Sequence, residues 1–125
     1  MSDEKEFSYS IFGNEAILIV NLSGSLNGKT ATTLEFLRLE ILKKEKILGV
    51  ILNFLHVDSL GLEVLPAMTL LQKTIREKPA ELRMCALTEE IKAKLLRSGI
   101  LRSSEVTESS KMAIYSISGQ RLKAA

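Results

Sequence analysis

The sequence of 125 residues is short of the residue types that build disulfides, zinc sites and membrane spans. Cys85 is the only cysteine and His56 the only histidine, so the chain can form no internal disulfide and no conventional Cys/His zinc site. No apolar run approaches the roughly 20 residues that a helix needs to cross a bilayer. The first residues, MSDEKEF, are acidic and contain no apolar signal region. We therefore expect a cytoplasmic protein without a bound metal and without an inserted membrane segment.

Motifs of nucleophilic catalysis and of phosphate binding are also missing. Ser59 does not lie in a G-x-S-x-G elbow, and no pattern brings His56 within hydrogen-bonding reach of it. No G-x-x-x-x-G-K-[ST] loop occurs, and the triplet GKT at residues 28–30 is typical of an ordinary helix N-terminus. A hydrolase or nucleotide-binding enzyme that used Ser59 or Lys29 would rest on isolated residues. The sequence therefore predicts neither an enzyme nor a cofactor.

The charge balance argues against nucleic acid as a direct partner. Seventeen Lys and Arg against fifteen Asp and Glu leave a net charge of +2, too small to predict a nucleic-acid-binding surface. The composition, 46% apolar and 26% charged, is that of an ordinary globular protein. A chain of this length can bury an independent core, so we expect one domain over residues 1–125, with its core over about 7–117.

The beginning of the chain predicts an antiparallel hairpin. Residues 7–12 are typical of a strand, Gly13 and Asn14 of a tight turn, and residues 16–22 (AILIVNL) of a strand rich in β-branched residues. The polar stretch SGS at residues 23–25 is expected to end this second strand.

The remaining pattern alternates helices with strands. Apolar residues recur at helical spacing over about residues 30–44 and again after residue 60. Between them, residues 47–54 (ILGVILNF) are almost continuously apolar, as in a central strand covered on both faces. Further strands are expected at residues 82–87 and 104–106, and further helices from the Thr88 cap to about Arg97 and over residues 109–117. This order predicts an α/β sandwich with a mixed, mostly parallel sheet of four to five strands, an N-terminal antiparallel hairpin and about four helices.

The stretch HVDSLGLEVL, residues 56–65, lies at the expected junction between the central strand and the helix that follows it. Asp58 and Ser59 have two interpretations there. They can cap the helix, or Ser59 can carry a phosphate, because a helix N-terminus offers free backbone N–H groups and the positive end of the dipole. A phosphate adds about −1.5 to −2 charge, so an exposed serine at a helix start suits a switch that leaves the fold intact.

Five motifs in a fixed order carry a resemblance to a known family. They are LSGSLN (22–27), TATTL (30–34), VILNF (50–54), DSLGLEVL (58–65) and MCALTEEIKAKLLRSGI (84–100). Together they resemble the STAS domain, and more narrowly the stand-alone bacterial anti-sigma factor antagonists. The resemblance extends over nearly the whole chain.

The resemblance implies a non-catalytic signalling protein that regulates transcription by exchanging partners. In that family the unphosphorylated antagonist binds a kinase-type anti-sigma factor and so frees a sigma factor. The kinase phosphorylates a serine directly after the motif aspartate, which here is Ser59, and a phosphatase reverses the reaction. The loop at residues 24–27 corresponds to the family's G-x-L-D, and exposed Leu26 and Leu62 are expected to supply contact area. The implied partner-binding residues are Asp58, Ser59, Gly61, Leu62, Gly24, Ser25, Leu26 and Asn27.

The sequence departs from the family pattern at three points. Asn27 stands where the family usually has aspartate. The segment before Asp58 is a few residues shorter than usual, and an ungapped alignment would put Gly61 and Leu62, without a hydroxyl, at the phosphorylation site. Pro66 would lie past the first turn of a helix that starts at Ser59, whereas a helix that starts near Leu62 would place it where proline is tolerated.

The intact D-S-x-G-L-x-x-L nevertheless favours Ser59. The departures motivate a second hypothesis, a STAS adapter that never cycles through phosphate. Such an adapter would be a scaffold component or the cytoplasmic subunit of a phospholipid-transport ABC complex.

Overall fold

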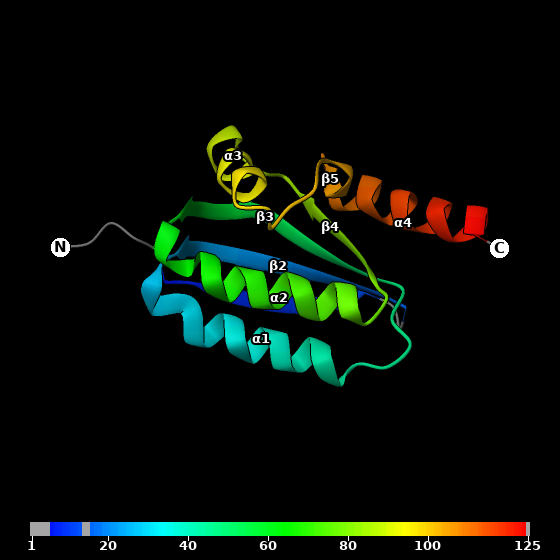
Figure 1. The fold of residues 1–125 in the computed structure, drawn as a ribbon, viewed down its shortest axis with the longest axis horizontal. Helices are drawn as coiled ribbons and strands as arrows, with labels where there is room; N and C mark the ends of the chain where they lie inside the picture. The colour runs from blue at the N-terminus through cyan, green and yellow to red at the C-terminus, as the bar shows by residue number, and fades with distance from the viewer. Residues whose placement is uncertain (1–5, 14–15, 125) are drawn as a thin grey trace.

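The computed structural model describes the backbone of residues 6–13 and 16–124. These residues form a five-stranded sheet in the order β1-β2-β3-β4-β5, with β1 antiparallel to β2 and every other pairing parallel (Figure 1). The mixed sheet, the N-terminal antiparallel pair and the alternation of helices with strands confirm the predicted α/β architecture. The strands are β1 (Ser8–Gly13), β2 (Ile17–Leu26), β3 (Gly49–Leu60), β4 (Glu81–Cys85) and β5 (Val106–Thr107).

Four α-helices and three short 3-10 helices connect and cover these strands. The α-helices are α1 (Ala31–Lys43), α2 (Leu65–Glu77), α3 (Glu89–Arg97) and α4 (Ser110–Ala124). The 3-10 helices are η1 (Gly28–Thr30), which runs into α1, η2 (Leu62–Val64), which runs into α2, and η3 (Ser103–Glu105). None of the helices in the described part of the chain is long and apolar enough to cross a membrane.

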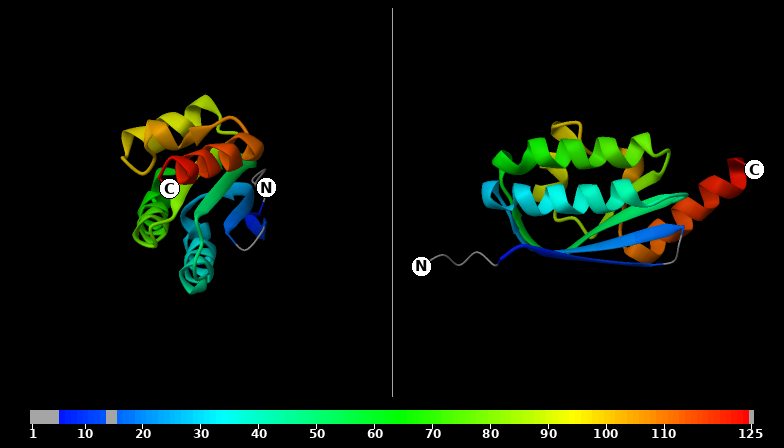
Figure 2. Two further views of the ribbon diagram at one scale, coloured as in Figure 1. Left: turned by 90° about the vertical axis from the view of Figure 1, so that its right-hand side faces the viewer. Right: turned by 90° about the horizontal axis from the view of Figure 1, so that it is seen from below.

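The helices bury apolar side chains on both faces of the sheet. On one face α1 and α2 lie side by side (Figures 1 and 2) and contribute the buried stripes that their spacing predicted. On the opposite face α4 covers a smaller cluster around Ile51 and Cys85. The α-helical side chains buried in the main core are Leu34, Leu37 and Ile41 from α1, Met68, Leu71 and Ile75 from α2, and Ile91 and Leu95 from α3.

Two strands run further than the sequence predicted. β2 does not end at residues 23–25 but continues to Leu26, and β3 continues past residue 54 to Leu60. The strands stay paired because β3 accommodates extra residues at two irregularities, between Asn21 and Ser23 and between Gly24 and Ser25 of β2. Gly24 has a φ of +99°, a conformation that glycine adopts without strain, at the second irregularity.

The ends of other elements follow local signals in the sequence. Thr88 caps α3, accepting a hydrogen bond from the backbone N–H of Ile91 at 3.2 Å, as predicted. Gly13 ends β1 with a φ of +120°, whereas the predicted turn residue Asn14 lies outside the described residues. The last helix begins one residue later than expected and extends seven residues beyond residue 117.

Candidate protein-binding rim

The ends of β2 and β3 and the residues that follow them form one rim of the sheet. Leu26 and Leu60 are paired at the ends of the two strands, and the backbone N–H of Gly61 donates to the carbonyl of Leu26 at 2.8 Å. From the other side, Lys94 of α3 donates its ammonium to the carbonyl of Leu60 at 2.8 Å. We refer to residues 24–29 and 58–63 as the rim. The rim therefore contains every residue that the family resemblance implied, on the ends of two adjacent strands and on the residues that directly follow them.

Ser59 lies in a strand and not at a helix start. It is an exposed residue near the end of β3, paired with Ser25 of β2. The helical segment begins at Leu62, with Gly61 as its N-cap residue, which confirms the later of the two predicted starts and excludes a helix that starts at Ser59. Pro66 explains the later start, because proline is tolerated in the first turn of α2, where the structure has it, but not in a helix interior.

The segment from Gly24 to Asn27 is only partly available to a partner. Gly24, Ser25 and Leu26 belong to β2 and are buried. The side chain of Leu26 is 0% exposed because it points into the main core, so the prediction that it supplies contact area is wrong.

Asn27 is a structural cap of the helical segment that leads into α1. Its side-chain oxygen accepts from the backbone N–H of Lys29 at 2.9 Å, and its own backbone N–H donates to the hydroxyl of Thr30 at 3.1 Å. These reciprocal bonds satisfy backbone donors at the start of η1. The amide of Asn27 caps this segment as an aspartate carboxylate would, but it adds no negative charge to the rim.

Glu63 is a rim residue that the sequence analysis missed. Its carboxylate accepts from the backbone N–H of Gly28 at 3.3 Å and so links η1 to η2. The same carboxylate folds back over Gly61, where a Cβ would lie 2.6 Å from Oε1 and 2.7 Å from Oε2. An acidic residue in the first turn of a helix was the available signal. The helix start thus already has a negative charge beside it.

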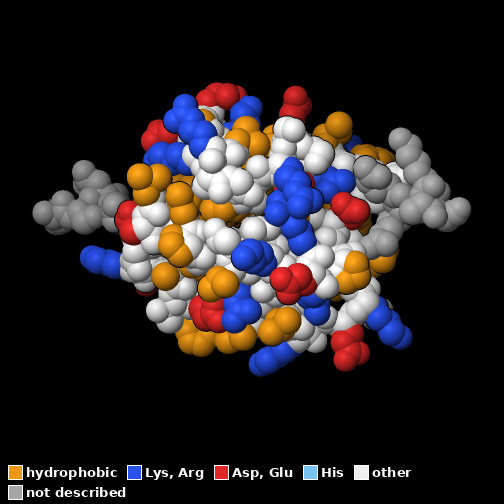
Figure 3. Space-filling model, in the orientation of Figure 1, with side chains coloured by type: hydrophobic (Ala, Val, Ile, Leu, Met, Phe, Trp, Pro, Cys, Tyr) orange, Lys and Arg blue, Asp and Glu red, His pale blue; other side chains and the backbone are white. Residues whose placement is uncertain are grey.

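The exposed residues of the rim include one large apolar side chain, that of Leu62. It is 66% exposed, which confirms that it is exposed as predicted. Next to it a hollow of about 360 Å³ is lined by Asn27, Gly28, Lys29 and Glu63. In the space-filling view, hydrophobic side chains gather at the left-hand end, where η2 and the start of α2 lie (Figure 3). Such a surface suits contact with another protein.

The side chains that could do chemistry are kept apart. His56 is exposed on β3, paired with Ser23. Cys85 is buried under α4, and burial raises the pKa of its thiol to about 11, so the thiolate form is strongly disfavoured. Within residues 6–13 and 16–124, no three His, Cys, Asp or Glu side chains come together as a metal site.

Comparison with protein families identifies the fold. The family model of the STAS domain matches residues 9–113. The chain belongs to the STAS domain family. No curated protein sequence is significantly similar to this STAS domain.

Solved STAS structures share the fold of this chain at low sequence identity. The anti-sigma factor antagonist SpoIIAA in its unphosphorylated form is 11% identical, with a TM-score of 0.72 over 91% of this chain and 97% of SpoIIAA. The Bacillus cell fate determinant SpoIIAA in its phosphorylated form is 9% identical, with a TM-score of 0.67 over 86% of this chain and 96% of SpoIIAA. A sulfate transporter family protein from Wolinella succinogenes is 18% identical, with a TM-score of 0.67 over 80% of this chain and 84% of the Wolinella chain. STAS domains of both signalling and transport proteins are therefore similar to this one.

Proposed function

We propose that this STAS domain is an anti-sigma factor antagonist that binds a kinase-type anti-sigma factor through the rim. The domain itself performs no chemistry in this proposal. The proposal rests on one observation. Two segments distant in the sequence meet at the rim, and they contain Asn27 on one side and Asp58, Ser59, Gly61 and Leu62 on the other. The fold of SpoIIAA and the length of its match to this chain support the same proposal.

Leu62 is the proposed centre of the contact. Its side chain is 66% exposed, so a partner that covers it would remove a large apolar area from water, which favours binding. Lys29 and Glu63 stand beside it with opposite charges, so the partner would present an apolar depression bordered by charges of both signs. The two segments that carry these residues are already joined by backbone hydrogen bonds, so binding requires little reordering.

Ser59 is the proposed phosphorylation site. Its side chain is exposed and follows Asp58, so a kinase can reach it without opening the sheet. Because Ser59 lies on β3, before the N-cap residue Gly61, its phosphate would project from the surface and would not sit on the first turn of the helix. An added charge of about −1.5 to −2 beside Asp58 would repel the acidic groups of the partner and would cost desolvation against its apolar depression, and so release the partner.

Phosphate mapping on the protein isolated from its native cells tests this switch. The proposal expects a mass increase of one phosphate in part of the wild-type population, located on Ser59, and none in Ser59→Ala. Ser104→Ala is the matched control, since Ser104 is an exposed serine on η3, which contacts the C-terminal end of α2 far from the rim. Unmodified Ser59 under conditions that activate the cognate kinase would refute the switch.

A second candidate function is an adapter that never cycles through phosphate. It is favoured by the start of η2, where Gly61 and Leu62 carry no hydroxyl and Glu63 already supplies a negative charge. The adapter would hold its partner permanently, as a scaffold component or as a subunit of a phospholipid-transport ABC complex. Capture of the same transporter subunits by wild type and Ser59→Asp, with no phosphate on either, would favour the adapter.

A further inference from the structure

The first strand forms an edge of the sheet and lacks the features that usually protect such an edge. β1 pairs only with β2 in the described structure, and its sequence SYSIFG contains no charged residue and no proline. Its six pairs with β2 run from Ser8 to Gly13 without the irregularities found between β2 and β3. Unprotected edges of this kind pair with further strands, because a row of backbone N–H and C=O groups stays available.

Exposed aromatic side chains stand on both sides of this edge. Phe12 of β1 is 52% exposed, and Phe36 of α1 is 61% exposed. The Tyr9 hydroxyl donates to Glu40, so this flank of α1 lies beside β1, and Phe36 lies one turn before Glu40 on the same flank. Backbone donors and acceptors bordered by apolar area are what a protein interface needs.

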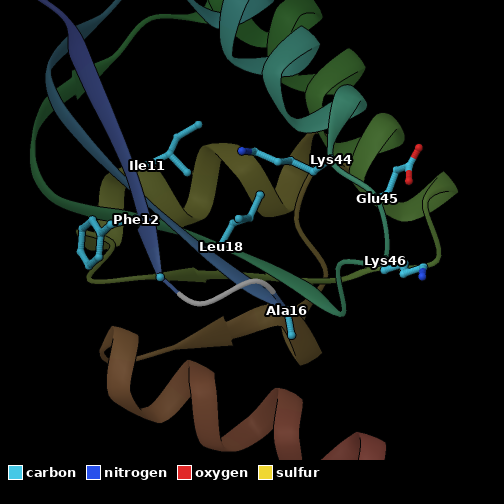
Figure 4. Close-up of a pocket in the computed structure, with 8 residues that line it drawn as sticks. Ile11, Phe12, Ala16, Leu18, Lys44, Glu45 and Lys46 are labelled. Atoms are coloured by element: carbon cyan, nitrogen blue, oxygen red, sulfur yellow. The ribbon is translucent and has the colours of Figure 1, made fainter.

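The distribution of charge along the edge selects the partner. At the Gly13 end of β1 a hollow of about 640 Å³ is lined by Lys44, Glu45 and Lys46 together with apolar residues, and Lys44 extends toward Ile11 (Figure 4). At the other end of the strand, Glu6 is exposed just before β1. Two antiparallel copies of this edge would bring Glu6 of each copy toward the lysines of the other.

We propose that β1 pairs antiparallel with β1 of a second copy, about a two-fold axis at Ser10, and joins two five-stranded sheets into one. Residues opposite one another in an antiparallel pair point to the same face, so a two-fold axis at Ser10 sets Tyr9 opposite Ile11 of the second copy. An aromatic–β-branched pair of this kind stabilises a sheet. The inference does not depend on the proposed function, since the two rims lie at opposite ends of the dimer and stay exposed.

Sedimentation of the wild-type protein from micromolar to millimolar concentration tests the dimer. We expect a monomer–dimer equilibrium that is abolished by Ser10→Lys, which puts a charge in the middle of the paired edge. Ser104→Lys, the same change at an exposed position of η3, should leave the dimer intact. A wild type that stays monomeric over the whole range, or a dimer that survives Ser10→Lys, would overturn the proposal.

A cysteine at position 10 tests the register and guards against a misfolded lysine variant. Oxidised glutathione should link two copies of Ser10→Cys through a disulfide, because paired residues on antiparallel strands approach to the separation that a disulfide spans. Ser104→Cys should give no link, and the native Cys85 is buried. If Ser10→Lys abolishes the dimer but Ser10→Cys does not link, the axis is not at Ser10 and this register is wrong.

Charge reversal tests the choice of a second copy. Lys44→Glu should weaken the dimer about five-fold, the size expected of two weak exposed ion pairs, because the two-fold axis repeats the pair. Adding Glu6→Lys to the same chain should restore the affinity, because the glutamate at position 44 of one copy then faces the lysine at position 6 of the other and the charges are again opposite. A double variant that dimerises more weakly than Lys44→Glu alone would contradict the charge pairing.

Discussion

The carboxylate of Glu63 lies so close over Gly61 that a Cβ at position 61 would be only 2.6 Å from its Oε1. The same carboxylate holds the backbone N–H of Gly28, 35 positions earlier in the chain. One exposed side chain thus couples the two segments of the rim, and the absence of a side chain at Gly61 permits it.

Gly61→Ala should uncouple the two segments with little effect on stability. Gly61 has a φ of −83°, which alanine also adopts, so the added methyl group acts by displacing the Glu63 carboxylate. We expect the free energy of unfolding to change by less than about 1 kcal/mol, since the lost hydrogen bond is exposed. The amide resonance of Gly28 should shift in an NMR spectrum, as it should in Glu63→Gln. An unshifted Gly28 amide in both variants would mean that the carboxylate does not hold it in solution.

Two substitutions of Asn27 distinguish the effect of its hydrogen bond as a cap from the effect of a charge at this position. Asn27→Ala removes the acceptor for the Lys29 amide and should cost about 1 kcal/mol of unfolding free energy, measured by urea denaturation. Asn27→Asp keeps the acceptor and restores the acid usual in the family, so its stability should stay close to that of wild type. An Asp variant as unstable as the Ala variant would contradict the assignment of Asn27 as a cap.

The ion pair of Arg76 and Glu105 should contribute far more to stability than the surface pairs. Glu105 is nearly buried, its side chain being 8% exposed, and it accepts both from Arg76 and from the backbone N–H of Arg102. Arg76→Ala would leave that carboxylate without its cation, at a cost of about 2 to 3 kcal/mol. Arg38→Ala removes a more exposed pair with Glu35 and should lower the free energy of unfolding by clearly less. Equal losses in urea denaturation would show that burial does not set the difference.

Alkaline pH should destabilise the protein partly through Cys85. The thiol has a pKa of about 11 in the folded protein against an ordinary value of 9.0, so folding favours its neutral form. The resulting stability is complete below pH 9 and is lost as the pH rises through about 11, by up to about 3 kcal/mol for two pKa units at 1.36 kcal/mol each. Cys85→Ala removes this contribution, while the raised pKa of Tyr9 remains in both proteins and cancels. If urea denaturation shows that the free energies of unfolding of wild type and Cys85→Ala fall by the same amount between these pH values, the prediction is wrong.

Local chemistry in the sequence predicted the caps and most of the core. Thr88 and Asn27 precede helices with the side chains that N-caps require, and the apolar residues of α1 and α2 recur at helical spacing. Each of these signals acts within one or two helical turns. The order of strands and helices then follows from the general rules for sheets with helical connections.

The length of β3 was not predictable in the same way. Its last residues include the polar His56, Asp58 and Ser59, and its buried residues Val57 and Leu60 are three apart, which breaks strand alternation. The irregular pairing with β2 produces that spacing, and pairing depends on a strand far away in the sequence. The contact between Glu63 and Gly28 is likewise tertiary, so no local pattern revealed it.

We propose that the rim binds its partner through a contact centred on Leu62. Affinity capture from native cells should compare wild type with Leu62→Asp and with Leu70→Asp, a matched control on α2 whose side chain is 52% exposed. We predict that wild type and Leu70→Asp retain the same kinase-type protein and that Leu62→Asp loses it, because a charge there blocks burial of the rim. Retention of that protein by Leu62→Asp, or its loss from both variants alike, would contradict the claim.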